Sequence, residues 1–223
     1  TATFSAFRTL TEPLGLFGGT FDPVHFGHLR LAEEAIGNLG LGGVRWIPAG
    51  QPPHRGAPQV TGQQRLEMVL RSTAGNARFS VDASEVEAAA PSYTVHTLER
   101  LRDEIGLDRP PVLLVGADAF AGLRTWHRWR ALFGLAPVAQ RPGFPVAAGN
   151  LPPELAAEFT TRLSDAAGLQ LAPAGGIVTF TMTQLAISAT RLRELLATGK
   201  SVRYLLPDGV LDYINLYQLY KSP

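Results

Sequence analysis

The chain has 223 residues, of which 45% are hydrophobic and 17% are charged, with 20 Lys and Arg, 19 Asp and Glu, and no Cys. This length predicts one large domain, or one domain with an elaboration, that can bury roughly 70% of its unfolded surface. The high hydrophobicity and the net charge of +1 argue against disorder and against binding of long nucleic acid through a general basic field. The absence of Cys excludes disulfides, thiol nucleophiles and Cys-ligated zinc.

The sequence contains no signal for a membrane or for secretion. No run approaches the roughly 18 continuous apolar residues that cross a bilayer. Residues 1–13 lack the apolar stretch and the cleavage site of a signal peptide. We therefore expect a cytoplasmic protein without a membrane partner, in which residues 1–13 form a flexible extension and residues 14–223 form the domain.

Apolar runs alternate with segments of helical period along the first half of the chain. In chain order, the pattern predicts a strand at 14–18, a helix at 26–39, a strand at 44–49, a helix at 63–74, a short strand near Phe79, a helix at 93–105 and a strand at 111–116. Strands that alternate with helices of about 10 to 15 residues are typical of βαβ units. We therefore predict an α/β fold, a Rossmann-like doubly wound parallel sheet with helices on both faces.

The second half of the chain is less regular. It predicts a strand ending in a turn at 137–143, a helix at 153–167, a strand at 175–182, and two helices, 189–197 and 207–220, that form a C-terminal helical elaboration of the same domain. The Pro- and Gly-rich stretches 49–58 and 141–153 predict long loops, which are often functional.

The strongest local motif follows the first predicted strand and reads GGTFDPVHFGH, residues 18–28. Gly18 and Gly19 let the backbone turn and approach a ligand without interference from a Cβ atom. The helix that begins within the motif offers N–H groups that favour a phosphate, at the sheet edge where ligands bind in open parallel sheets. The imidazoles of His25 and His28 could stabilise charge that develops on a phosphate during a displacement.

The same motif is compatible with two further interpretations. His25 and His28 could be ordinary loop residues, one capping the helix and the other partly buried. Alternatively, Asp22 and the two histidines could bind zinc or iron in a metal-dependent hydrolase, although no fourth ligand is evident. A P-loop at 198–201, a dinucleotide-binding GxGxxG and a GxSxG elbow are each excluded by spacing or context.

A second candidate for phosphate binding is the segment ISATRLR, residues 187–193. Ser188 or Thr190 can cap the helix that follows. Arg191 and Arg193 flank its apolar stripe on opposite sides, so we expect only one of them to point into a given site, and spacing does not choose between them. A capped surface helix with solvated arginines is the alternative, but a triphosphate needs clamps from more than one element.

These motifs, with IPAGQPPHR, PSYTVHTL, VGAD, TWHRW and QRPG, closely resemble the bacterial nicotinate-nucleotide adenylyltransferases in order and approximate spacing, from residue 14 to about residue 217. HxGH alone indicates only the wider nucleotidyltransferase superfamily, whereas SYT, TW and ISAT are more specific. The resemblance implies transfer of AMP from ATP to nicotinate mononucleotide, by in-line displacement at the α-phosphate without a covalent intermediate. The products would be nicotinate adenine dinucleotide and pyrophosphate, a step of NAD biosynthesis, with Mg²⁺ bound mainly through the ATP phosphates.

The resemblance also implies a role for single residues on the ATP side. His25, His28 and Arg193, rather than Arg191, would be catalytic and hold the triphosphate. The other ATP-binding residues would lie in the strand-helix turn, at the end of strand 111–116 and in the second phosphate motif: Gly18, Gly19, Thr20, Phe21, Gly116, Asp118, Ile187, Ser188 and Thr190.

For the mononucleotide, the resemblance implies that Trp126 stacks on the nicotinate ring, as a cation–π contact favours, and that Thr94 binds its carboxylate. Arg141 and His54 would lie near its phosphate. The residues alone leave these roles open, since Trp126 could be a core anchor, Thr94 a helix N-cap and Arg141 a turn residue. His127, beside Trp126, departs from the tyrosine common in the family, and Gln140 departs from a common arginine.

Alternative functions follow from the same residues. The protein could be an adenylyltransferase of the same superfamily that acts on nicotinamide mononucleotide or on another phosphate acceptor. It could also be a module that binds a dinucleotide without chemistry. The sequence does not predict an oligomeric state.

Overall fold

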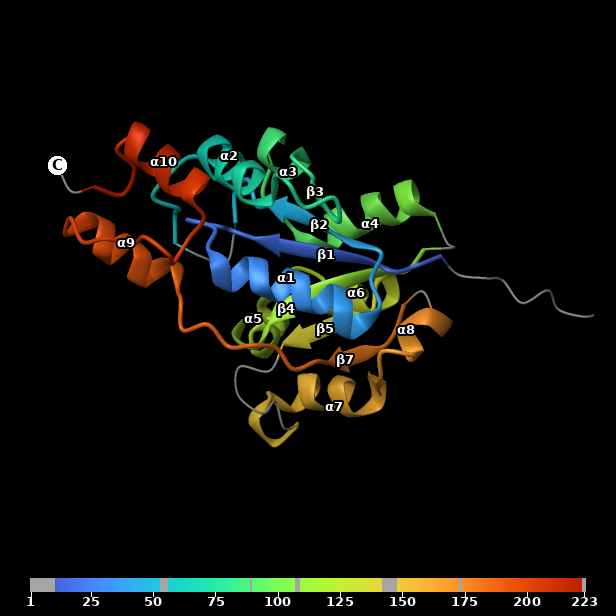
Figure 1. The fold of residues 1–223 in the computed structure, drawn as a ribbon. Coiled ribbons are helices and arrows are strands. Elements are labelled where there is room, and N and C mark those ends of the chain that lie inside the picture. Colours follow the sequence, from blue (N-terminus) through green and yellow to red (C-terminus); the bar gives the residue numbers. More distant parts are fainter. Residues whose placement is uncertain are drawn as a thin grey trace, which may run out of the picture.

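A computed structural model describes residues 11–52, 56–88, 90–106, 109–141, 148–172 and 174–221, with backbone only at 140, 141, 148, 170 and 171. Within these ranges, a 7-stranded parallel sheet has the order β3-β2-β1-β4-β5-β7-β6 (Figure 1). The strands are β1 (Leu14–Gly19), β2 (Gly43–Pro48), β3 (Phe79–Val81), β4 (Pro111–Gly116), β5 (Val138–Arg141), β6 (Leu163–Ser164) and β7 (Ile177–Thr179). The order reverses between the adjacent central strands β1 and β4, which confirms the predicted doubly wound sheet.

Helices pack on both faces of the sheet. Those of the described ranges are α1 (Phe26–Leu39), α2 (Gly62–Thr73), α3 (Ser84–Glu87), α4 (Thr94–Ile105), α5 (Ala117–Ala121), α6 (Trp129–Leu135), α7 (Pro153–Arg162), α8 (Gly168–Leu171), α9 (Ala189–Ala197) and α10 (Asp208–Leu216), with 3₁₀ turns at Leu123–Thr125 and Ala148–Asn150. Side chains of α1, α2, α9 and α10 form the core on one face, and those of α4, α5, α6 and α7 form the core on the other.

Alternate residues of the central strands supply these two cores. In β4, Val112 and Leu114 pack toward α1, whereas Leu113 and Val115 pack toward α4. Because both faces of a central parallel strand are buried, its sequence is a continuous apolar run rather than an alternating one. The run PVLLVG therefore has the pattern of the strand it forms.

The second half differs from the sequence prediction in its details. α7 ends at Arg162 rather than at residue 167, because Leu163 and Ser164 leave the helix and pair with β7. Pairing in the sheet thus overrides the local helical period. α10 ends at Leu216 rather than at residue 220, and the residues that follow form turns with a positive φ at Gln218 and Tyr220.

The helices between β4 and β5 were not predicted from the sequence. α5 follows β4 without a loop, and α6 begins at the second Trp of TWHRW. Trp129, Leu132 and Phe133 of α6 are all buried. Their spacing of three and then one is the helical pattern, but it extends over only two turns and gives a weak signal.

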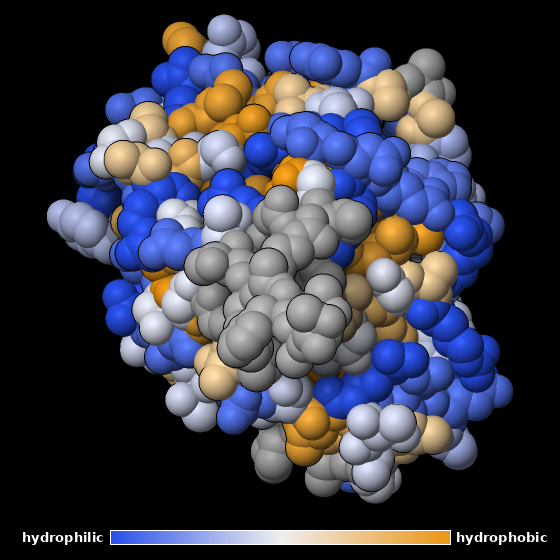
Figure 2. Space-filling model, turned by 90° about the vertical axis from the view of Figure 1, so that its right-hand side faces the viewer, coloured by the Kyte–Doolittle hydropathy of each residue, from blue (hydrophilic) through white to orange (hydrophobic). Residues whose placement is uncertain are grey.

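Figure 2 shows the side of the molecule at the amino ends of the strands, where hydrophilic residues cover much of the visible surface and hydrophobic patches lie between them. Among the described residues, no helix has the length and hydropathy needed to cross a bilayer. The division into an extension 1–13 and a domain 14–223 stays a prediction, because residues 1–10 lie outside the described ranges.

Candidate active site

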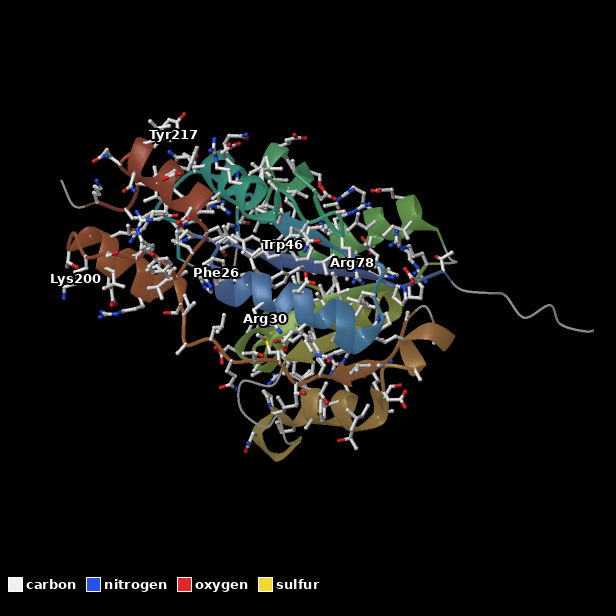
Figure 3. All side chains as sticks on the ribbon, in the orientation of Figure 1. Phe26, Arg30, Trp46, Arg78, Lys200 and Tyr217 are labelled. Carbon is white, nitrogen blue, oxygen red and sulfur yellow. The ribbon has the colours of Figure 1, made fainter. Side chains whose placement is uncertain are left out.

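Segments from both ends of the sequence meet at the carboxyl edge of the sheet. The arrowheads of the strands in Figure 1 point to the side on which α9 and α10 lie, and α1 begins there. Figure 3 shows Phe26, at the start of α1, on the same side as Lys200 and Tyr217, whereas Arg78 lies toward the opposite end. In open parallel sheets this edge is where ligands bind, at the point where the strand order reverses.

Two glycines leave open space at this edge. Among the described residues, none has an atom within 4 Å of a Cβ built on Gly18 in β1 or on Gly116 at the end of β4. Gly19 has a different reason to be glycine, because a Cβ there would lie 2.8 Å from the ring of Phe21. Phe21 is buried beneath the loop and has a φ of 50°, in the left-handed region. The backbone at the ends of the central strands is therefore accessible to a ligand, while the buried Phe21 ring packs under the loop that follows β1.

His25 and His28 stack on each other at the start of α1. Their ring centroids lie 3.8 Å apart with an interplanar angle of 29°. The backbone N–H of His25 donates to Nδ1 of His28 at 3.2 Å, so the neutral His28 ring carries its proton on Nε2. Gly27 allows this stacking, because a Cβ there would lie 3.0 Å from the His25 ring. The two imidazoles thus lie together at the positive end of α1, where the backbone N–H groups of Phe26 and His28 already donate to carbonyl oxygens of Leu205 and His25.

Arg193 extends from α9 to the same loop. Its Nη1 donates to the backbone oxygen of Asp22 at 2.7 Å, and its Nη2 donates to Oγ1 of Thr190 at 3.4 Å. The side chain of Arg193 is 24% exposed, whereas that of Arg191 is 63% exposed and pairs with Glu194. Of the two arginines that the sequence left undecided, Arg193 is the one at the loop.

The remaining residues predicted to bind ATP lie around this loop. Ser188 is the N-cap of α9, and its Oγ accepts the backbone N–H of Arg191 at 3.2 Å. Ile187, just before it, packs against the core on the α1 side. Asp118 is exposed in the first turn of α5, directly after Gly116. These positions bring the second phosphate motif and the end of β4 to the edge that holds the histidines.

The buried carboxylate of Asp22 is engaged by protein groups. Its Oδ1 accepts the hydroxyl of Tyr220 at 2.7 Å, and its Oδ2 accepts the backbone N–H of Gln59 at 3.0 Å. Across the described ranges, no group of three His, Cys, Asp or Glu side chains is arranged to hold a metal ion. The geometry therefore gives no support to a zinc or iron site built from Asp22, His25 and His28.

Arg65, which the sequence analysis did not single out, joins the ends of β1 and β2. It is 1% exposed, and its Nη1 donates to the carbonyl oxygens of Thr20 at 2.8 Å and Ala49 at 2.6 Å, while its Nη2 donates to that of Gly50 at 2.9 Å. Burial lowers the pKa of its guanidinium, which nevertheless stays charged at neutral pH. The sequence did contain a signal for Arg65: it is a charged residue on the apolar side of a predicted helix, one turn before Val69, where charged residues are rare.

The residues predicted to bind the nicotinate ring lie where α4 begins. Thr94 is the first residue of α4 and Tyr93 is the N-cap, so Thr94 is not the cap. Trp126 is half-buried against the core on the α4 side. The rings of Tyr93 and His127 lie 4.7 Å apart, which brings the start of α4 beside the turn that carries Trp126. Trp129, by contrast, is a buried core residue.

Ser92 ties the loop after β2 to the start of α4. Its Oγ accepts the backbone N–H of Gly50 at 2.9 Å and that of Gln51 at 3.3 Å. Beside it, Glu85 accepts the hydroxyl of Thr97, and burial raises the pKa of the Glu85 carboxyl. The SYT motif therefore begins with a residue that holds the neighbouring loop in place.

Two predicted contacts of the mononucleotide phosphate are placed only in part. Arg141 ends β5 in register with Gly116 of β4, so its backbone lies at the same edge, but its side chain is outside the described part of the chain. His54 falls within residues 53–55, which are also outside it. The roles of both residues stay predictions.

This fold and loop are typical of nucleotide-binding proteins of the α/β class, with imidazole and guanidinium groups that suit a phosphate at the switch point of a parallel sheet. The family described as cytidylyltransferase-like has a model that matches residues 16–195. Two solved structures of Plasmodium falciparum nicotinic acid mononucleotide adenylyltransferase, complexed with NaAD and with APC, give TM-scores of 0.68 and 0.67 and cover 94% of this chain and 98% of theirs. At 12% identity, this likeness concerns the fold alone.

Relatives in sequence are closer. A protein of Dechloromonas aromatica named "probable nicotinate-nucleotide adenylyltransferase" is 72% identical over 96% of this chain and 100% of its own length. A protein of the same name from Pseudomonas paraeruginosa is 48% identical over 94% of this chain and 98% of its own. The chain therefore belongs to the nicotinate-nucleotide adenylyltransferase family, within the cytidylyltransferase-like proteins.

Proposed function

We propose that the protein transfers AMP from ATP to nicotinate mononucleotide, giving nicotinate adenine dinucleotide and pyrophosphate. One observation carries the proposal: the stacked His25 and His28 and the guanidinium of Arg193 meet at one loop, beside the open backbone at Gly18 and Gly116. The names of the relatives in sequence support the same reaction. Because the reaction consumes ATP, we expect it to take place in the cytoplasm.

The chemistry requires positioning and charge stabilisation rather than a covalent nucleophile. A phosphate oxygen of the mononucleotide forms a bond to the α-phosphorus of ATP, and the bond from that phosphorus to the bridging oxygen of pyrophosphate breaks. Negative charge develops on the transferred and leaving groups. Nε2–H of His28, the guanidinium of Arg193 and the positive end of α1 would stabilise it, each acting as a donor fixed before the reaction.

Mg²⁺ belongs to this proposal. The ion prefers phosphate oxygens and waters with one or two carboxylates, so it does not need a cluster of acidic ligands. Asp118 is exposed at the carboxyl edge, while the oxygens of Asp22 accept from Tyr220 and Gln59. The residues present therefore fit an ion that ATP brings with it and that Asp118 could contact, where it would neutralise phosphate charge.

On the acceptor side, Trp126 and Thr94 are the residues that we propose to bind the nicotinate ring. An electron-poor pyridinium is attracted to the face of an indole, and a threonine hydroxyl can donate to the carboxylate. Stacking reads the ring rather than its substituent. A preference for the acid over the amide would therefore come from polar groups such as that of Thr94.

The test is release of pyrophosphate from purified protein mixed with ATP, Mg²⁺ and either nicotinate or nicotinamide mononucleotide. We expect release with the nicotinate form and no release when the acceptor is left out. A faster reaction with the amide would correct the acceptor. No release with either mononucleotide, or release without any acceptor, would contradict an adenylyl transfer, and tight binding of the dinucleotide without turnover would favour a binding module.

A further inference from the structure

The segment after α10 returns to the loop between β1 and α1. Gln218 and Tyr220 have φ values of 52° and 61°, in the left-handed region that side-chain-bearing residues seldom adopt. This bend buries Tyr220, which is 8% exposed, and places its hydroxyl 2.7 Å from Oδ1 of Asp22. Burial and the negative charge of Asp22 raise the pKa of Tyr220, so its hydroxyl keeps the proton that it donates.

Arg193 lies close to the same carboxylate but makes its hydrogen bond elsewhere. Its Nη1 is 3.9 Å from Oδ2 of Asp22, within ion-pair range but too far for a hydrogen bond, and donates instead to the backbone oxygen of Asp22 at 2.7 Å. The carboxylate has other donors, the hydroxyl of Tyr220 and the backbone N–H of Gln59. The guanidinium is thus held at the loop without a hydrogen bond to the carboxylate.

From this geometry we propose that Tyr220 is a positioning residue for ATP binding. Its hydroxyl donates to the Asp22 carboxylate and so keeps the guanidinium of Arg193 available to the triphosphate. The proposal rests on the proposed function, because it takes Arg193 as the clamp of the triphosphate. Without the hydroxyl, Oδ1 of Asp22 is a buried acceptor that lacks its donor, and such a group is costly. Arg193 is 24% exposed and already lies 3.9 Å from Oδ2, so it has room to turn to the carboxylate, whereas Arg65 is buried with both terminal nitrogens held by carbonyl oxygens.

The variant Tyr220→Phe removes the hydroxyl and keeps the ring. We expect calorimetry with ATP and Mg²⁺, without an acceptor, to show binding about tenfold weaker than in the wild type, because a charge-assisted ion pair within the protein now competes with the phosphates. In turnover, KM for ATP should rise while KM for nicotinate mononucleotide is unchanged. The matched control is Tyr213→Phe, a buried tyrosine of α10 whose ring packs against Arg71. Equal ATP affinity of Tyr220→Phe and the wild type would overturn the proposal.

A double variant separates positioning from a general loss of stability. Asn in place of Asp22 is neutral and attracts Arg193 much less, so Asp22→Asn combined with Tyr220→Phe should bind ATP more tightly than Tyr220→Phe alone. If the hydroxyl served only to stabilise the fold, the second substitution at a buried site would weaken binding further, which would overturn the proposal. Unfolding curves of all variants confirm that each is folded at the temperature of the titration.

The two proposals fail in different ways. Calorimetry with ATP needs no acceptor, so a wild type that binds ATP but releases no pyrophosphate with either mononucleotide contradicts the proposed reaction and leaves the role of Tyr220 testable by the same titrations. Active wild type with unchanged ATP affinity in Tyr220→Phe contradicts the role of Tyr220 alone.

Discussion

The guanidinium of Arg65 donates to the carbonyl oxygen of Thr20 at 2.8 Å, and the same side chain donates to two further carbonyl oxygens at the end of β2. Buried carbonyl oxygens need donors, and the chain leaves the sheet at these positions, so no neighbouring strand supplies them. One cation therefore replaces the hydrogen bonds that a longer sheet would have made. It fixes the loops that follow β1 and β2 relative to each other.

Replacing Arg65 by Met should therefore be strongly destabilising. The substitution leaves three carbonyl oxygens without these donors, each at a cost of about 1–3 kcal/mol, so we expect the free energy of unfolding in urea to fall by about 3 kcal/mol or more. Arg71→Met on the same helix is the control, because Arg71 is exposed, pairs with Glu67 and lies over the ring of Tyr213, and its loss should cost no more than about 1–2 kcal/mol. Equal losses in the two variants would contradict this role of Arg65.

Two glycine substitutions should separate binding from stability. Gly18→Ala places a methyl group where no atom of the described residues lies within 4 Å, so we expect a free energy of unfolding within about 1 kcal/mol of the wild type. ATP binding should be weaker, since the methyl group occupies the open strand end. Gly50→Ala places a Cβ 1.9 Å from the backbone oxygen of Glu85 and should cost about 1–3 kcal/mol or more. ATP titrations and urea unfolding curves of both variants test the contrast. Unchanged ATP affinity in Gly18→Ala would show that ATP does not bind at that strand end.

His28→Ala should reduce turnover much more than stability. The ring carries its proton on Nε2, and removal of one donor that stabilises transition-state charge lowers kcat by about 10²–10³-fold. His28 is only partly buried, so the variant should stay folded by circular dichroism. Pyrophosphate release at saturating substrates measures the effect. Turnover close to that of the wild type would exclude His28 from the mechanism.

Glu85 predicts a pH dependence of stability. Burial raises its pKa in the folded protein above the ordinary value of 4.5, so the folded protein binds this proton more tightly than the unfolded chain. The stability that this contributes is complete below pH 4.5 and is lost as the pH rises through the raised pKa. Glu85→Gln cannot ionise, so its free energy of unfolding relative to the wild type should increase over that range. Urea unfolding measured across this pH range tests the effect, and parallel pH profiles for Glu85→Gln and the wild type would contradict the assignment.

The fold could be predicted wherever one local pattern decided the structure. The run PVLLVG and the periodic segment 26–39 correspond to β4 and α1, because a buried strand and an amphipathic helix each require the pattern that they show. The edge strand at Leu163 could not be predicted, because only pairing with β7 produces it. The end of α10 was likewise set by a distant group, since Tyr220 turns back to reach Asp22.

The site was predictable to a similar extent. His25, His28 and Arg193 belong to short motifs whose residue types already indicate phosphate chemistry, and the structure brings these motifs to one edge. The residues that hold the motifs in position were missed. Arg65 and Tyr220 act through hydrogen bonds to residues distant in the sequence, which leave no periodic pattern.

The bond between Asp22 and Tyr220 joins residues separated by 198 positions. During synthesis, the histidine loop emerges long before Tyr220, and closing so long a loop of chain is slow compared with forming neighbouring strands and helices. The sheet and the finished loop are therefore separate events in folding. Most of the sheet can therefore form in a nascent chain before the hydroxyl of Tyr220 is present to donate to the Asp22 carboxylate.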